Sequence, residues 1–96
     1  MSLIPLYKKI QSVSVTLPLV LEIEQEVDAL PVFFNRLKTG HWRTDEVVTT
    51  VQMMLQKCGE THDWKDLGKE MVIDGLEHYV GVVADVLSPV LTGQKA

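Results

Sequence analysis

The side chains best suited to metal binding or nucleophilic catalysis are three histidines and one cysteine: His41, His62, His78 and Cys58. A zinc site is usually tetrahedral, and two histidines four residues apart on one helix often supply two of its ligands. No two of these histidines have that spacing. Cys58 and His62 are four residues apart, but Gly59 interrupts a helix between them, and two ligands do not complete a tetrahedron. We therefore expect no bound metal.

Cys58 is the single cysteine of the chain, which excludes an internal disulfide and favours a reducing compartment. A nucleophilic cysteine needs a nearby cation or histidine that stabilises its thiolate. Cys58 instead continues an apolar stripe at helical spacing, and burial disfavours the thiolate. We predict a small, unreactive core residue.

Carboxylates are densest at Glu22, Glu24, Glu26 and Asp28. Glu22 and Glu26 lie one turn apart on a predicted helix, so they share a face. Paired carboxylates act as general acid and base only in a cleft that separates their pKa values. An exposed face leaves both ionised, and we interpret this group as an acidic stripe that faces water or a partner.

The pair Gly68–Lys69 is the closest approach to a phosphate-binding loop. A P-loop has a second glycine five residues earlier and a Ser or Thr after the lysine, whereas this chain has Asp63 and Glu70 at those positions. With no catalytic, nucleotide or metal motif present, we expect a non-enzymatic protein that binds no cofactor.

The elements that position these side chains are predicted to be helices, because apolar residues recur every three or four positions between clear caps and stops. Asp28, Thr44 and Asp63 are the expected caps, and Pro89 is expected to weaken or end the last helix. The predicted helices cover about Leu17–Val27, Leu30–Leu37, Asp45–Cys58, Trp64–Met71 and Leu76–Leu91, with breaks near Gly40, Gly59 and Asp74–Gly75.

Residues Ser12 to Leu17 alternate between polar and apolar side chains, which favours one short β-strand ahead of the helices. The sequence thus predicts an all-α fold, a compact small bundle of about five helices with this short N-terminal strand. The chain has 96 residues, of which 46% are apolar and 23% charged, so it holds one domain of ordinary globular composition. We assign residues 1–12 to a lead segment and residues 13–93 to the helical domain.

The net charge of −4 gives no broad cationic surface for nucleic acid or anionic lipid. The longest uncharged stretch, Ile10–Leu21, is shorter than the roughly 20 apolar residues that span a bilayer. The first residues also lack the charge order of a secretory signal, since Lys8 and Lys9 follow the apolar residues. We expect a cytoplasmic protein with neither nucleic acid nor membrane as a partner.

Large apolar side chains are the candidates for a protein-binding groove, because such a groove accepts the apolar face of an amphipathic helix. The alternative is that they fill the core of a small domain, which has few large residues to spare. Both interpretations stay open for the five candidates Phe33, Phe34, Trp42, Trp64 and Met71.

Several segments together resemble the small tail-assembly chaperones of tailed phages and gene transfer agents. They are the run from Val13 to Glu24, the apolar segment Leu30–Leu37, the turn Lys38-Thr-Gly-His-Trp-Arg-Thr-Asp-Glu that leads into a long helix, and the later Trp64–Met71 and Asp74–Gly75. The similarity extends over about Val13–Gly93. The chain departs from the family pattern at Pro18, where a glycine or another small residue is more usual, and residues 1–12 lack a glycine-containing hairpin.

The resemblance implies a cytoplasmic protein of a bacterial host, encoded among phage or prophage tail genes. It implies binding to the tape-measure protein, a long helical partner that the chaperone keeps soluble, and recruitment of tail-tube subunits. It implies no catalytic residues, and it leaves self-association open. The alternative from another class is a small helical regulatory protein that binds nucleic acid.

Overall fold

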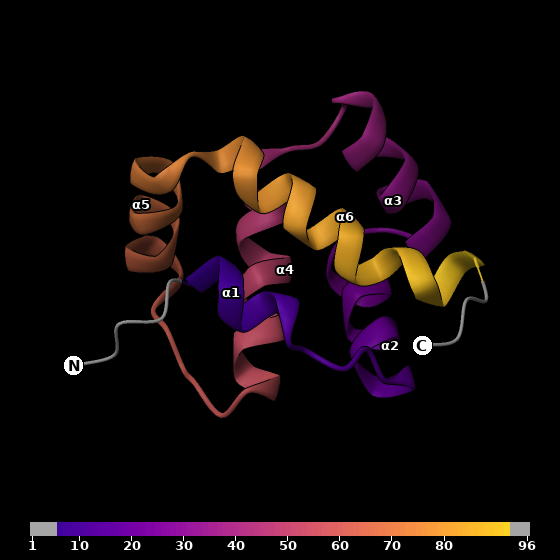
Figure 1. Cartoon of the computed structure of the whole chain (residues 1–96), viewed down its shortest axis with the longest axis horizontal. Helices are drawn as coiled ribbons and strands as arrows, with labels where there is room; N and C mark the ends of the chain where they lie inside the picture. Colours follow the sequence, from indigo (N-terminus) through magenta and orange to yellow (C-terminus); the bar gives the residue numbers. More distant parts are fainter. Residues whose placement is uncertain (1–5, 93–96) are drawn as a thin grey trace.

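The computed structural model describes residues 6–92, and all regular secondary structure in that range is helical. The mainly helical fold class predicted from the sequence is confirmed, with one helix more than expected. The helices are α1 (Leu6–Gln11), α2 (Leu17–Glu26), α3 (Leu30–Thr39), α4 (Thr44–Lys57), α5 (Trp64–Asp74) and α6 (Leu76–Thr92), shown in Figure 1.

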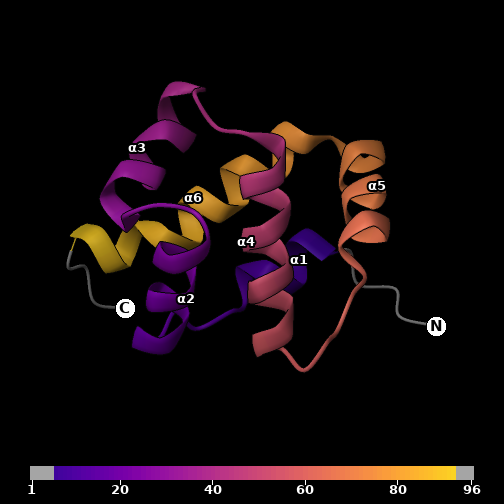
Figure 2. The same ribbon diagram turned by 180° about the vertical axis from the view of Figure 1, so that it is seen from behind.

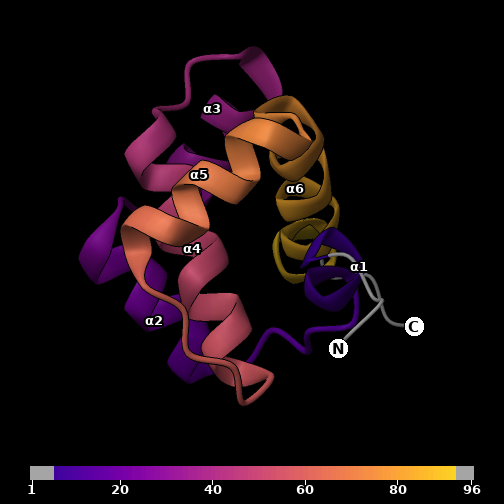
Figure 3. The ribbon, with the colours of Figure 1, turned by 90° about the vertical axis from the view of Figure 1, so that its left-hand side faces the viewer.

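Helix α4 lies at the centre of the bundle and contacts α1, α2, α5 and α6. Helix α6 crosses it and also contacts α1, α3 and α5 (Figure 2). Turned to the side, the bundle has α1 and α6 on one side of α4 and α2 on the other (Figure 3). On its remaining flank, α4 contacts only α5 among the described helices.

The core forms where the apolar faces of the described helices meet around α4 and α6, with α3 packed on α6 and α2. Its members include Ile10, Phe33, Leu55, Met71 and Tyr79, each fully buried. Thr50 of α4 is buried among them, and its hydroxyl donates a hydrogen bond to the carbonyl of Glu46 at 2.8 Å, so no polar atom of that side chain is left unpaired.

Two of the predicted helix boundaries are confirmed by their local geometry. Asp63 caps α5, since its carboxylate accepts a hydrogen bond from the backbone N–H of Asp66 at 3.2 Å. Gly40 follows α3 with φ of +83°, the left-handed conformation that only glycine adopts readily, and the N–H of His41 donates to the carbonyl of Arg36.

The other two expected caps are wrong. Thr44 is the first residue of α4, and the preceding Arg43 donates its backbone N–H to the carboxylate of Glu46 at 3.1 Å. Asp28 accepts from the N–H of Ala29, outside α3. The first N–H of α3, on Leu30, instead donates to Glu24 of α2 at 2.9 Å. A glutamate from the neighbouring helix therefore caps α3, an interaction between elements that local sequence spacing does not encode.

The predicted N-terminal strand is absent from residues 6–92. Residues 12–16 connect α1 to α2 without a partner strand, and a strand needs another one to pair its backbone groups. Val13 and Val15 of the alternating pattern pack partly against the core, whereas Leu17 begins α2 and is 70% exposed. The alternation therefore reflects a connection that lies against the bundle.

Part of the expected lead segment forms α1, which packs on α6 and α4. Ile10 is fully buried, and the ring of Tyr7 meets that of His78 edge to face at 4.3 Å between centroids. A helix of six residues is not stable alone, so these tertiary contacts hold it. Residues 1–5 of the lead segment and residue 93 of the assigned domain lie outside the described residues.

The structure corrects two further expectations. Pro89 does not end α6, which continues through it to Thr92. The proline lies near the end of the helix and removes the one hydrogen bond that a backbone N–H there would donate to the carbonyl of Asp85. Cys58 is exposed, because α4 ends at Lys57 and the chain turns there before the apolar stripe can continue into the core.

Candidate partner-binding groove

The five predicted partner-binding residues do not lie together. Phe33 and Met71 are fully buried in the core. Phe34 and Trp42 are partly buried against it, and the ammonium group of Lys38 lies over the Phe34 ring at 5.3 Å. Trp64 is 40% exposed and lines a groove at the surface. Of these five side chains, Trp64 is therefore the one that the structure places in the groove.

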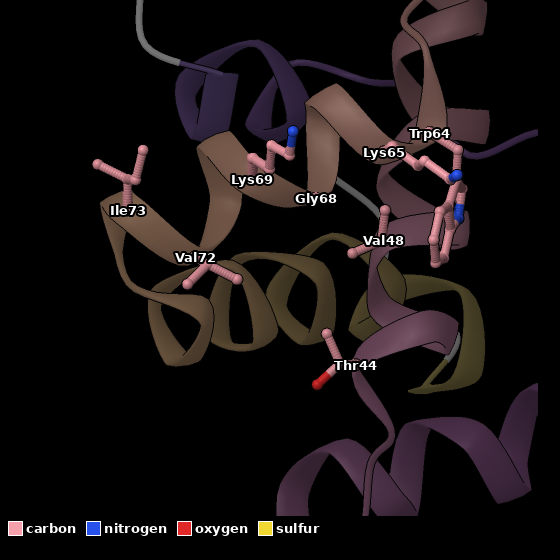
Figure 4. Close-up of a pocket in the computed structure, with 8 residues that line it drawn as sticks. All are labelled: Thr44, Val48, Trp64, Lys65, Gly68, Lys69, Val72 and Ile73. Carbon is pink, nitrogen blue, oxygen red and sulfur yellow. The ribbon is translucent and has the colours of Figure 1, made fainter.

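The groove lies between the start of α4 and the length of α5, and its volume is about 600 Å³ (Figure 4). One wall is α5 and the other is the first two turns of α4, so the packing of two helices fixes its shape. Its lining is almost entirely apolar, so Lys65 and Lys69 contribute mainly the methylene groups of their side chains, and their ammonium groups lie at the rim. The residues that line it are Thr44, Val48, Trp64, Lys65, Gly68, Lys69, Val72 and Ile73.

Helical spacing explains why α5 presents an apolar wall. Trp64, Gly68 and Val72 lie four residues apart, so they form one row along the helix next to the buried row of Leu67 and Met71. The apolar surface of α5 is thus wider than its core contact requires. The part that exceeds the core contact forms the wall of the groove.

Gly68 sets the depth of the groove at its middle. A methyl group built at this glycine would lie 3.7 and 3.8 Å from the two methyl carbons of Val48, which is ordinary van der Waals contact. Any larger side chain at position 68 would extend into the space above Val48. The glycine therefore keeps the floor of the groove open between the two helices.

Trp64 forms one end of the groove and is held in position by α4. Its indole N–H donates to the hydroxyl of Thr49 at 3.0 Å, which fixes the ring orientation while the side chain stays partly exposed. Tryptophan is among the residues that contribute most to binding at protein interfaces, because its large ring loses little conformational entropy when it is already ordered.

Val72 and Ile73 extend the apolar surface to the other end of α5, where they are 61% and 82% exposed. Isolated exposed aliphatic residues are common, but a contiguous apolar patch beside a tryptophan is typical of an interaction surface. The groove and these two side chains form one such surface, which we call the α4–α5 groove.

The predicted acidic stripe takes part in contacts within the fold. Glu22 forms an ion pair with Lys57 of α4 at 2.9 Å, and Glu24 caps α3 as described above. Glu22 and Glu26 also line a polar hollow between α2 and α4, together with side-chain amides from both helices. This hollow lacks the apolar lining that would bind a helix.

Within residues 6–92, no three histidine, cysteine, aspartate or glutamate side chains come together as a metal site would require. One electrostatic cluster places Glu60 between Lys9 at 2.7 Å and His62 at 2.9 Å. Hydrogen bonds from Lys9 and then His62 lower the pKa of the Glu60 carboxyl, so it stays ionised and joins α1 to the loop after α4.

None of the described helices is long and apolar enough to cross a membrane.

A family described as phage tail tube protein, GTA-gp10, matches residues 9–93. The chain belongs to this family. The match spans α2 to α6 and the second half of α1, so it includes both walls of the α4–α5 groove. The predicted relationship to phage and gene-transfer-agent tails is confirmed at this level. No curated protein and no solved structure matches the chain.

Proposed function

We propose that this tail-family protein is a non-enzymatic tail-assembly chaperone that binds the tape-measure protein through the α4–α5 groove. The observation that supports this role is a preformed apolar groove that ends at an ordered tryptophan. We propose the tape-measure protein as the partner because the sequence resembles tail-assembly chaperones, which bind that protein. Tail-tube subunits would be recruited to the same complex.

The dimensions of the groove suit a single helix. The eleven residues of α5 give a wall about 16 Å long at 1.5 Å per residue, which corresponds to roughly three turns of a bound helix. Three turns present apolar side chains at positions i, i+3 or i+4, and i+7, the usual anchors of a helix bound in a groove. Covering these anchors would protect an aggregation-prone helical partner until assembly.

Co-expression with the tape-measure protein of the same gene cluster tests the proposal. We expect the wild-type chain to raise the amount of soluble tape-measure protein and to co-purify with it. The substitution Val72→Asp should abolish both effects, because it places a charge in the apolar groove. No retention of the tape-measure protein by the wild-type chain would refute the chaperone assignment.

Val32→Asp provides a matched control. Val32 is 47% exposed on α3, a helix that does not pack against α5 in the described part of the chain, and it carries the same side chain as Val72. Both substitutions replace an exposed helical valine by aspartate, so they should cost similar stability. Equal loss of binding in both variants would place the interface elsewhere.

A structural role in the tail tube is the second candidate, and the family description favours it. A tube subunit stays in the finished particle in many copies, whereas a chaperone leaves before completion. Quantitative mass spectrometry of purified particles separates the two roles. The chaperone proposal predicts that this protein is absent from particles whose tape-measure protein is readily detected.

A further inference from the structure

We infer that the α4–α5 groove selects an amphipathic helix with acidic residues along one edge of its apolar face. This inference rests on the proposed function only for the identity of the protein that carries the helix. The preference itself comes from two lysines, Lys65 and Lys69, which line the groove on α5 (Figure 4).

These two ammonium groups have no ion-pair partner among residues 6–92, although the chain carries a net charge of −4. Four cations of the fold are paired with carboxylates: Lys9 with Glu60, Arg36 with Asp28 and Glu46, Arg43 with Asp45, and Lys57 with Glu22. Lys8 and Lys38 are also without an ion pair, but they lie on α1 and α3, away from the groove. Lys65 and Lys69 therefore place two unpaired positive charges at the rim of the groove, on a protein that is acidic as a whole.

The positions of the charges on α5 place the lysines at the edge of the groove. With 100° between successive residues, Lys65 and Lys69 form a row beside the apolar row of Trp64, Gly68 and Val72. Asp66 and Glu70 lie one residue further around the helix and are absent from the groove lining. The carboxylates of Asp66 and Glu70 thus lie on the side of α5 that faces away from the groove, and they form no ion pair with the two lysines.

The opposite wall carries no charge in the groove, since α4 contributes only Thr44 and Val48 there. Positive charge is consequently confined to the α5 edge. A bound helix would place its apolar residues over Gly68 and Val48 and its acidic edge over α5. Because the two lysines are four residues apart, about 6 Å along the axis, acidic residues three or four positions apart on the partner would face both of them.

The test uses two synthetic amphipathic peptides with the same apolar face, one flanked by glutamates and the other by lysines. Fluorescence anisotropy of the labelled peptides measures their affinity for the intact protein at low and at physiological salt. We expect the glutamate-flanked peptide to bind at least about 5-fold more tightly at low salt, since it forms two exposed ion pairs where the lysine-flanked peptide brings like charges together. The preference should decrease as salt screens the rim charges.

The double substitution Lys65→Glu and Lys69→Glu should reverse the preference. The control is Lys8→Glu with Lys38→Glu, which alters two exposed lysines outside the groove and changes the net charge equally, from −4 to −8 because two charges of +1 become −1. Circular dichroism establishes that each variant is folded, and the neutral pair Lys65→Gln and Lys69→Gln should remove the preference without reversing it.

Equal binding of the two peptides to the wild-type protein, or a preference that survives the Lys65 and Lys69 substitutions, would overturn the inference. Failure of the proposed function gives a different result. In that case the peptide preference and its reversal are observed, but the full-length tape-measure protein is not retained.

Discussion

Replacement of Gly68 by alanine separates the role of the groove from the stability of the fold. Gly68 lies inside α5, its φ is not in the left-handed region, and the added methyl group would contact Val48 at 3.7 Å without a clash. Alanine is favoured over glycine in a helix interior by about 1 kcal/mol. The variant should therefore be more stable than the wild-type protein.

The magnitude follows from comparison with Gly81, which lies inside α6 and where an added methyl group would have no neighbouring atom within 4 Å. Gly81→Ala should gain only the helix-propensity term of about 1 kcal/mol. Gly68→Ala should gain this and part of the roughly 0.8 kcal/mol for burial of a methyl group. For a domain of this size, 1 kcal/mol raises the melting temperature by about 4–8 °C.

Binding should respond in the opposite direction. The methyl group at position 68 occupies the floor of the groove, and overpacking of a fitted contact typically costs about 1–3 kcal/mol. Gly68→Ala should thus weaken binding of the tape-measure protein by about 5- to 150-fold, while Gly81→Ala leaves it unchanged.

Urea denaturation gives the free energies of unfolding, and titration calorimetry gives the affinities. A destabilised Gly68→Ala variant would show that α5 lies closer to α4 than the structure places it. Unchanged affinity in a stabilised Gly68→Ala variant would show that the partner does not reach the floor of the groove.

Three further substitutions test the fold by urea denaturation. Leu55→Ala should lower the free energy of unfolding by about 2–5 kcal/mol, since the leucine is fully buried, and a loss below 1 kcal/mol would contradict its place in the core. Glu24→Ala should cost about 0.5–2 kcal/mol because it removes the cap of α3, whereas no loss would show that the cap is absent in solution. Tyr79→Phe should cost about 1–2 kcal/mol, since it removes the hydrogen bond that the hydroxyl donates to Asp74 at 2.8 Å. Burial, and then this hydrogen bond, raise the pKa of Tyr79 above its ordinary value of 10. Above about pH 10 the tyrosine ionises only in the unfolded state, so the wild-type protein should lose stability there. The phenylalanine variant should lose less stability over the same pH range.

The helical body could be predicted because local signals agree with each other along most of the chain. Gly40 and Asp63 have the conformations that their residue types favour, and the apolar stripes mark the buried faces. Helix α1 escaped prediction because six residues give too little periodicity, and its stability comes from contacts with α6. The cap from Glu24 to Leu30 likewise depends on how two helices meet.

The candidate site could be predicted only in part. Large apolar residues were the right class of side chain, but sequence alone does not separate a buried Met71 from an accessible Trp64 on the same helix. The signal that could have found the groove is the width of the apolar surface on α5. Trp64, Gly68 and Val72 form a second row beside the buried one, and no core contact explains it.

Nuclear magnetic resonance of the labelled protein with its tape-measure partner shows which residues the partner contacts. Binding in the α4–α5 groove should give the largest chemical-shift changes at the indole N–H of Trp64 and at the methyl groups of Val48 and Val72. The exposed leucines of α2, Leu17 and Leu21, should change little. Changes concentrated on α2, with the Trp64 indole signal unmoved in the saturated complex, would contradict the α4–α5 groove as the binding site.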